Sequence, residues 1–305
     1  MKPKLLFIVN PNAGKGAIHG AALNCIDIFV QAGFDVSVHT TQAVKDATHV
    51  VETRADEFER IVCAGGDGTL NEVVAGLIQG NHRIPLGYIP AGTVNDFASS
   101  LGIPKHPLEA ARIAVYGKAQ PVDIGRFGTR SFCYIAAFGA FTNVSYTTPQ
   151  AQKNFLGRTA YILEGIKSLP HLKPYNIHLE TEDGIVIDDQ FIYGMVSNAT
   201  SIGGFKELTP PDVRMDDGLF EVVLIRQPKG ALDWQSIFNE LIQPKENSKF
   251  LLRCKASWLR VRSQEPLSWT LDGEYGGTTE NVEISNKYHA FRIFTSQTLE
   301  KKTDC

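Results

Sequence analysis

The first 125 residues alternate short apolar runs with longer stretches whose apolar residues recur at helical spacing. Runs of four or five apolar or β-branched residues that are bounded by Gly, Pro or Asn are typical of buried strands. Such runs occur at Leu5–Val9, Asp35–His39, Arg60–Cys63 and Leu86–Ile89. The helical stretches are Ala21–Gln31, Ala47–Glu57, Leu70–Ile78 and Pro107–Val115. This alternation predicts a parallel sheet with helices on both faces.

Three loops follow strands of this predicted sheet, and they begin at Asn10, Ala64 and Pro90. In open parallel sheets, ligands bind beyond the carboxyl ends of the strands. The three loops are therefore expected to share one edge of the sheet and to form one site.

The pattern changes after about Val122. Two strand-like runs, Asn176–Glu180 and Ile185–Asp188, flank Thr181–Gly184, which is a hairpin signal. Further strand-like runs are Phe191–Ser197, Phe220–Ile225, Ser257–Val261, Ser268–Leu271, Val282–Ser285 and Phe291–Phe294. Helices are expected near Thr159–Leu169 and Leu232–Ile242. This part is predicted to be an antiparallel β domain.

The expected fold class is α/β plus β, with an N-terminal Rossmann-like α/β domain, a C-terminal antiparallel β-sandwich domain and a cleft between them. The expected bounds are 1–125 for the first domain, with the tail 292–305 as an additional candidate part of it, and 126–291 for the second. A length of 305 residues fits two domains.

Composition and charge exclude several classes of protein. Apolar residues make up 43% of the chain and charged residues 21%, which excludes a disordered or collagen-like chain. A net charge of −3 argues against a dedicated nucleic-acid binder. Five cysteines without Cys-x-x-Cys spacing fit a reducing compartment. No apolar run reaches about 18 residues, so a soluble, cytoplasmic protein is expected.

The first loop, Asn10–Gly16, combines glycines with Lys15. Glycine lets backbone amides approach a ligand closely, and a lysine adds positive charge, so the loop suits phosphate oxygens. It is not a Walker A loop, because the Gly-Lys-Ser/Thr ending is absent. A simple turn explains it equally well.

The second loop, Cys63–Thr69, has three glycines in four positions and leads into a helix. Backbone amides at a helix N-terminus favour an anion, and Asp67 could meet a nucleotide or its magnesium. A strand-to-helix turn capped by Asp or Thr is the alternative, although three glycines exceed what a cap requires.

The third loop, Pro90–Ala98, places a hydroxyl, an amide and a carboxylate within four residues, at Thr93, Asn95 and Asp96. Taken by itself, this pattern favours a helix cap at Asn95 or Asp96 over a binding site.

Six motifs in this order resemble the bacterial diacylglycerol kinase and lipid kinase family, whose catalytic domain is shared with sphingosine kinases. They are Asn10–Gly16, Gly65–Glu72, Pro90–Phe97, Val122–Gly125, Met215–Leu219 and Asp272–Gly277. Gly-Gly-Asp-Gly-Thr also occurs in NAD kinases and, in a related form, in phosphofructokinases. The third loop and the late Asp-Gly-Glu indicate the lipid branch.

The resemblance implies that ATP binds along two of the glycine loops, Thr41 and Thr93. The implied contacts are Asn10, Pro11, Asn12, Ala13, Gly14, Thr41, Gly66, Asp67, Gly68, Thr69, Leu70, Asn71, Glu72 and Thr93. Glu274 would be the base that takes the proton of the lipid hydroxyl, because an alcohol is a poor nucleophile until a carboxylate receives its proton. Asp67 and Asp123 would hold Mg²⁺. Without the resemblance, Asp272–Glu274 is also explained as a hairpin turn.

The resemblance also implies a second, structural metal ion, held by the carboxylate of Asp217 and the backbone carbonyls of Arg214 and Leu219. So few protein ligands leave room for water molecules, which Mg²⁺ tolerates. A turn that enters the next strand is the alternative.

The segment from Arg126 to Lys173 holds six basic residues and one acidic residue, Glu164. We expect it to face anionic lipid, at the inner face of the membrane; a solvated face with scattered charges is the alternative. The resemblance further suggests a homodimer.

The sequence therefore predicts a bacterial enzyme of phospholipid metabolism: an ATP- and Mg²⁺-dependent lipid kinase that phosphorylates diacylglycerol or a related lipid. The alternatives are an NAD kinase-like phosphotransferase acting on a soluble substrate and a regulator that senses a nucleotide without turnover.

Overall fold

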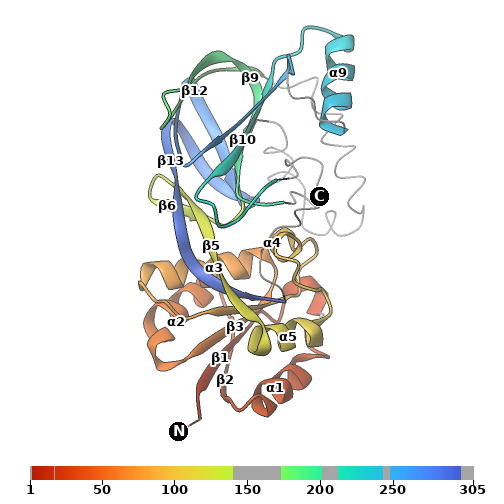
Figure 1. Cartoon of the computed structure of the whole chain (residues 1–305), viewed down its shortest axis with the longest axis vertical. Coiled ribbons are helices and arrows are strands. Elements are labelled where there is room, and N and C mark those ends of the chain that lie inside the picture. The colour runs from red at the N-terminus through yellow and green to blue at the C-terminus, as the bar shows by residue number, and fades with distance from the viewer. Residues whose placement is uncertain (1, 17, 140–172, 201–211, 243–247, 297–305) are drawn as a thin grey trace, which may run out of the picture. The chain divides into compact units, whose positions relative to one another are not determined.

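The structure is a computed structural model that describes residues 2–16, 18–139, 173–200, 212–242 and 248–296 (Figure 1). The chain divides into two compact units: Met1–Val122 with His289–Cys305, and Asp123–Tyr288. It passes between them twice, within the strands β5 (Lys118–Phe127) and β13 (Glu274–Thr295). The fold is mixed α/β with a large β-rich portion.

The first unit is built on a parallel sheet. Its strands are β1 (Lys4–Val9), β2 (Asp35–Thr40), β3 (Arg60–Gly65) and β4 (Leu86–Pro90), in the spatial order β4-β3-β1-β2. The end of β13 extends the sheet, because Ile293 pairs in parallel with Leu86 on β4. Apolar side chains throughout β1, β3 and β4 are buried, as the short apolar runs predict. The prediction of a buried strand was wrong for β2, whose residues are exposed or half-buried because it lies at the edge of the sheet.

Five α-helices accompany this sheet in the described part of the first unit. They are α1 (Ala22–Gln31), α2 (Asp46–Arg54), α3 (Asp67–Gln79), α4 (Asp96–Ser100) and α5 (Pro107–Tyr116). Helix α1 packs against α5, and α2 packs against α3. Right-handed crossovers place α1 on one face of the sheet and α2 and α3 on the other, which confirms the expected helices on both faces.

The strand order reverses direction between β1 and β3. The chain moves from β1 to β2 on one side, and then returns past β1 to β3 and β4 on the other. Such a switch point leaves room beyond the carboxyl ends of its two strands, where ligands of α/β proteins bind. The loops after β1 and β3 are the first and second loops of the sequence analysis.

The second unit is predominantly antiparallel. Besides parts of β5 and β13, its strands are β6 (Arg130–Phe132), β7 (Ile135–Gly139), β8 (Tyr175–Thr181), β9 (Val186–Ser197), β10 (Phe220–Arg226), β11 (Leu251–Ala256) and β12 (Trp258–Leu271). The helix α9 (Ala231–Ile242) matches an expected one. Trp269 contacts Phe127 and Phe138 edge-on in the core.

The structure tests some of the remaining expectations about the fold, and the others stay predictions. The hairpin around Thr181–Gly184 is confirmed, because β8 pairs with β9. The helix near Thr159–Leu169 lies outside the described residues. The sandwich layering, the expected domain bounds and the cleft stay predictions.

Candidate functional site

The second loop turns directly into helix α3, which starts at Asp67 and therefore three residues earlier than expected. The first backbone hydrogen bond of the helix joins the N–H of Leu70 to the carbonyl of Gly66. The amides of residues 67–69 precede that bond, so they lie at the positive end of the helix dipole. Gly68 is exposed, and a Cβ added there would meet no atom within 4 Å. An anion has open access to this turn.

The third loop lies against both other loops. A Cβ on Gly14 would come within 2.0 Å of the carbonyl oxygen of Ala91, and Gly14 has a φ of +52°. A Cβ on Gly92 would come within 2.7 Å of the Cα of Gly66. Backbones approach this closely only where a side chain is absent. The three loops therefore meet at one edge of the sheet.

Side chains also join the first loop to helix α3. The amide Nδ2 of Asn10 donates to the hydroxyl of Thr69 at 2.9 Å, and the Asn10 Oδ1 accepts from the N–H of Asn12. A hollow of about 260 Å³ opens beside this contact, lined by Asn10, Asn12, Thr41, Gln42, Ala43, Val44, Thr69 and Glu72. Its volume lies just below the range for small-molecule sites, which begins at roughly 300 Å³.

Five of the predicted ATP contacts thus line one hollow: Asn10, Asn12, Thr41, Thr69 and Glu72. The remaining ones belong to the three loops or to the first turns of α3 but do not line it, and they are Pro11, Ala13, Gly14, Gly66, Asp67, Gly68, Leu70, Asn71 and Thr93. Leu70 is fully buried, so only its backbone could face a ligand.

Glu72 has a structural contact besides its place in the hollow. One carboxylate oxygen accepts from the N–H of Lys45 at 2.9 Å, and Lys45 adopts a left-handed conformation with φ of 68°. Glu72 therefore holds the turn that carries Val44, an 86% exposed side chain at the edge of the hollow.

Asp67 ties the second loop to the third. Its carboxylate oxygens accept from the backbone N–H groups of Asp96 at 3.2 Å and Phe97 at 3.4 Å. Burial, and then the charge of Asp96, raise the pKa of the Asp67 carboxyl to about 6. Asp96 is itself 3% exposed. Two neighbouring carboxylates that repel each other are a natural place for a divalent cation.

The sequence analysis did not include Asp96 among the site residues. It favoured a helix cap at Asn95 or Asp96; α4 begins at Asp96 with Asn95 at the N-cap position, and Asn95 makes no side-chain cap hydrogen bond. The backbone N–H of Asp96 donates to the Asp67 carboxylate, and this contact shows that the two residues share one location. A signal was present in the sequence, since an acidic residue follows both β3 and β4 on one edge of the sheet.

Asp123 belongs to the second unit and is fully buried. Its Oδ2 accepts from the N–H of Gly218 at 2.6 Å, and its own N–H donates to the carbonyl of Met215 at 2.8 Å. It therefore lies against the loop of residues 214–219, where the second metal ion is expected. Asp67 belongs to the first unit, and the binding of Mg²⁺ by Asp67 and Asp123 together stays a prediction.

The predicted ligand oxygens of Asp217 and Leu219 already accept hydrogen bonds in the loop of residues 214–219. The Asp217 carboxylate accepts from the N–H of Leu219 at 3.1 Å, and the Leu219 carbonyl accepts from the side chain of Asn286 at 3.4 Å. The Arg214 side chain contacts Asp216. Carboxylate and carbonyl oxygens suit a hard cation such as Mg²⁺. In the described part of the chain, no three His, Cys, Asp or Glu side chains cluster as a metal site, so water or phosphate would supply further ligands.

Glu274 starts β13 immediately after a two-residue hairpin turn. Leu271 pairs with Glu274 across the turn, and its central residues Asp272 and Gly273 have φ values of 52° and 84°. Positive φ at both central residues is the geometry of a type I′ turn, for which Asp-Gly is a preferred sequence. The hairpin alternative is therefore correct as a description of the backbone, and the turn leaves the Glu274 side chain exposed.

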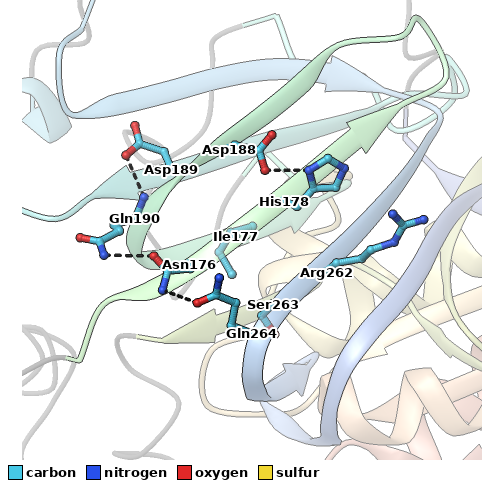
Figure 2. Close-up of a pocket in the computed structure, with 9 residues that line it drawn as sticks. All are labelled: Asn176, Ile177, His178, Asp188, Asp189, Gln190, Arg262, Ser263 and Gln264. Carbon is cyan, nitrogen blue, oxygen red and sulfur yellow. Dashed lines mark hydrogen bonds and ion pairs between the residues drawn. The ribbon is translucent and has the colours of Figure 1, made fainter.

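A larger hollow of about 440 Å³ lies elsewhere, on the face of strands β8, β9 and β12 (Figure 2). Its amides bond to one another, since Gln190 donates to Asn176 and Asn176 donates to Gln264. His178 contacts Asp188 at 2.7 Å. Cross-strand pairs of this kind stabilise a sheet, and none of the predicted site residues lines this hollow.

Most of the predicted basic segment lies outside the described residues, including Lys153, Arg158, Glu164 and Lys167. Of the described part, Arg126 and Arg130 donate to the backbone carbonyls of Gly128 and Tyr275, and Lys173 contacts Glu265. No helix among the described residues has the length and apolar character needed to cross a membrane.

Comparison with known proteins places these features in context. A family model described as the diacylglycerol kinase catalytic domain matches residues 4–127. The diacylglycerol kinase of Bacillus subtilis (strain 168) is 35% identical over 300 residues, which cover 98% of each chain. That of Staphylococcus epidermidis (strain ATCC 12228 / FDA PCI 1200) is 33% identical over 97% of this chain and 93% of its own.

The fold is also similar to a solved structure. A crystal structure of a diacylglycerol kinase candidate from Bacillus anthracis str. Sterne superposes with a TM-score of 0.84 at 26% sequence identity. The superposition covers 96% of this chain and 95% of that one. The similarity extends over both units rather than the nucleotide loops alone.

Proposed function

The chain belongs to the diacylglycerol kinase family, and from that premise we propose that it transfers the γ-phosphate of ATP to the hydroxyl of diacylglycerol or a related lipid. Family membership makes it a kinase, and therefore a transferase. The product would be phosphatidic acid or its analogue. The observation that carries the proposal is the convergence of three glycine-containing loops at the switch point of the first unit's sheet.

The nucleotide would lie across these loops. Its phosphates would accept from the amides in the first turn of α3, where Gly68 leaves open space. The remainder would occupy the hollow between Asn10, Thr41 and Glu72, with Val44 beside the base. This arrangement uses the predicted contacts in the three loops and adds Val44.

Bound Mg²⁺ would neutralise the charge that develops on the phosphates. Asp67 is the proposed protein ligand on α3, and the structure adds Asp96 as a second candidate. Asp123 is proposed to join them. The second metal ion would use the Asp217 carboxylate and the carbonyls of Arg214 and Leu219.

Glu274 is the proposed general base. An alcohol attacks the γ-phosphate only as its proton leaves, and a positioned carboxylate receives that proton in the transition state. The Glu274 side chain is exposed at the start of β13, so a substrate hydroxyl can approach it. Contact with an anionic membrane and a homodimer are proposed from the resemblance and the basic segment.

The decisive experiment incubates the purified protein with γ-labelled ATP, Mg²⁺ and a lipid extract. Label in the organic phase, in a product that mass spectrometry identifies as a phosphorylated diacylglycerol, is the expected result. Label in an aqueous product would favour the NAD kinase-like alternative. ATP binding without any transfer would favour the regulator.

The placement of the phosphates predicts the effect of Gly68→Ala. The added methyl meets no protein atom, and alanine favours a helix more than glycine does, so the fold should be at least as stable. The methyl would occupy space beside the α3 amides, and we expect the KM for ATP to rise about tenfold, which equals about 1.4 kcal/mol of binding. Steady-state kinetics and thermal unfolding measure both effects.

Gly230→Ala is the matched control. Gly230 directly precedes helix α9, and a Cβ there also meets no atom within 4 Å. This variant should keep the KM for ATP of the wild type. An unchanged KM in Gly68→Ala would show that the phosphates lie elsewhere.

A further inference from the structure

The carboxylate of Asp272 has an unusual set of partners. One oxygen accepts from the backbone N–H groups of Tyr134 at 2.9 Å and Ile135 at 3.0 Å, and the other accepts from the N–H of Cys133 at 2.6 Å. Asp272 is 8% exposed. Three consecutive backbone amides therefore bind one buried carboxylate, and hydrogen bonds to a charged group are stronger than neutral ones.

The backbone of Asp272 reinforces this contact. Its N–H donates to the carbonyl of Ile135 at 2.8 Å. Asp272 therefore both accepts from and donates to the backbone of Ile135. Strand β7 also pairs with β12 just before the turn, since Leu271 lies opposite Ala136. The tip of the β12–β13 hairpin is thus fixed to the segment that enters β7.

Glu274 lies two residues beyond this anchor and is held on its other side as well. The guanidinium of Arg130 donates to the carbonyl of Tyr275 at 3.0 Å. Asp272 and Arg130 therefore restrain the backbone immediately before and after Glu274. The Glu274 side chain itself is exposed, so the position of its carboxylate depends on how firmly that backbone is held.

Resting on the proposed role of Glu274 as base, we propose that Asp272 is a positioning residue that holds Glu274 at its working place through the amides of residues 133–135. A general base must lie within hydrogen-bonding distance of the proton it receives. A displacement of about 1 Å can cost roughly 100-fold in rate. The Asp272 carboxylate takes no proton and touches no substrate in this proposal.

The test is Asp272→Asn. Asparagine tolerates a positive φ, so the turn is retained, but its amide nitrogen replaces one acceptor and faces a backbone donor. We expect kcat to fall roughly 10- to 100-fold while the KM for ATP stays within about twofold, because the nucleotide loops are unaltered. A purely structural loss would lower the folded fraction, and thermal unfolding of the same samples measures that fraction.

A double variant separates positioning from general stability. If Asp272 acts only through Glu274, then Asp272→Asn has nothing left to impair in a Glu274→Gln protein. The double variant should match Glu274→Gln within about twofold, measured over long incubations so that the residual rate is quantified. An equal fold-loss in both backgrounds, or a wild-type kcat in Asp272→Asn, would overturn the proposal.

Glu182→Gln is the control for loss of a similar anchor. The Glu182 carboxylate accepts from the backbone N–H groups of Ser257 and Trp258, near the start of the same strand β12. This variant should retain the wild-type kcat. A wild-type rate in Glu274→Gln alone would refute the proposed base, whereas a strong loss there with no effect of Asp272→Asn would refute only the positioning role.

Discussion

Replacing Glu274 with glutamine is expected to lower kcat by about 10²- to 10⁴-fold, the usual contribution of a general base. Glutamine keeps the size of the side chain but cannot take the proton of the lipid hydroxyl. Glu274 is exposed, and surface substitutions usually change stability by no more than about 0.5 kcal/mol. Phosphorylated lipid measured by mass spectrometry reports the rate, and thermal unfolding reports the fold.

Glu280→Gln provides the matched control on the same strand. Glu280 is also an exposed glutamate of β13, and its replacement should leave kcat unchanged. If Glu274→Gln kept a rate within a few-fold of the wild type, another group would have to be the base.

Asp67→Asn is expected to lower kcat by roughly 100-fold or more, because a lost metal contact is worth several kcal/mol and each 1.4 kcal/mol is a factor of ten. Asparagine retains an acceptor for one of the α4 amides, so the third loop should stay in place. The concentration of Mg²⁺ needed for half-maximal rate should rise as well. Kinetics over a range of Mg²⁺ concentrations measure both effects.

The raised pKa of Asp67 also predicts how the Mg²⁺ requirement changes with pH. Burial and the charge of Asp96 raise its pKa to about 6 in the metal-free protein. Below that pH the carboxyl is protonated, and the proton competes with Mg²⁺ for the carboxylate. The Mg²⁺ concentration that the wild type requires should therefore increase as pH falls through 6. Above pH 6, the buried, ionised carboxyl of Asp67 lowers the free energy of unfolding. This penalty disappears as pH falls below 6 and the carboxyl is protonated.

Asp27→Asn serves as the control, because Asp27 is exposed on α1 and contacts only Gln31 among the interactions described for it. It should show the Mg²⁺ dependence of the wild type at every pH. A wild-type Mg²⁺ requirement in Asp67→Asn would contradict the assignment of Asp67 as a ligand.

Hydrophobic periodicity predicted the positions of the strands of the first unit well, because each short run has a distinct boundary, although β2 is not buried as expected. Leu5–Val9 lies within the strand Lys4–Val9, and Pro107–Val115 within the helix Pro107–Tyr116. The start of α3 was placed too late, since Asp67 and Gly68 were read as loop residues. They carry no apolar side chain that would mark a helical face, so hydrophobic periodicity cannot detect them.

The second unit was predicted less completely. The predicted runs Ser257–Val261 and Ser268–Leu271 fall, except for Ser257, in one strand, β12, whose pairing shifts register between Arg262 and Leu267. A bulge interrupts the apolar alternation without ending the strand, so the pattern appears as two elements. Strand β11 was missed, because intermediate burial from Leu252 to Lys255 gives no clear alternation.

The candidate site, too, was predicted only in part. Glycine-rich loops after strands were sufficient to predict that the three loops meet. The role of Asp272 could not be predicted, because its partners are backbone amides some 138 residues away in the sequence. Backbone donors carry no signature in the sequence, and only the folded chain brings them to the carboxylate.

The return of β13 to the first unit has a consequence for how the protein is synthesised. Ile293 completes the sheet beside Leu86, Phe291 stacks on Phe97, and Arg60 lies over the ring of Phe294. The ribosome synthesises β13 after the other strands of both units, so the nascent first unit keeps a bare sheet edge until β13 has emerged. Fragments cut to residues 4–127 would carry that edge permanently, and uncovered edges of this kind invite aggregation.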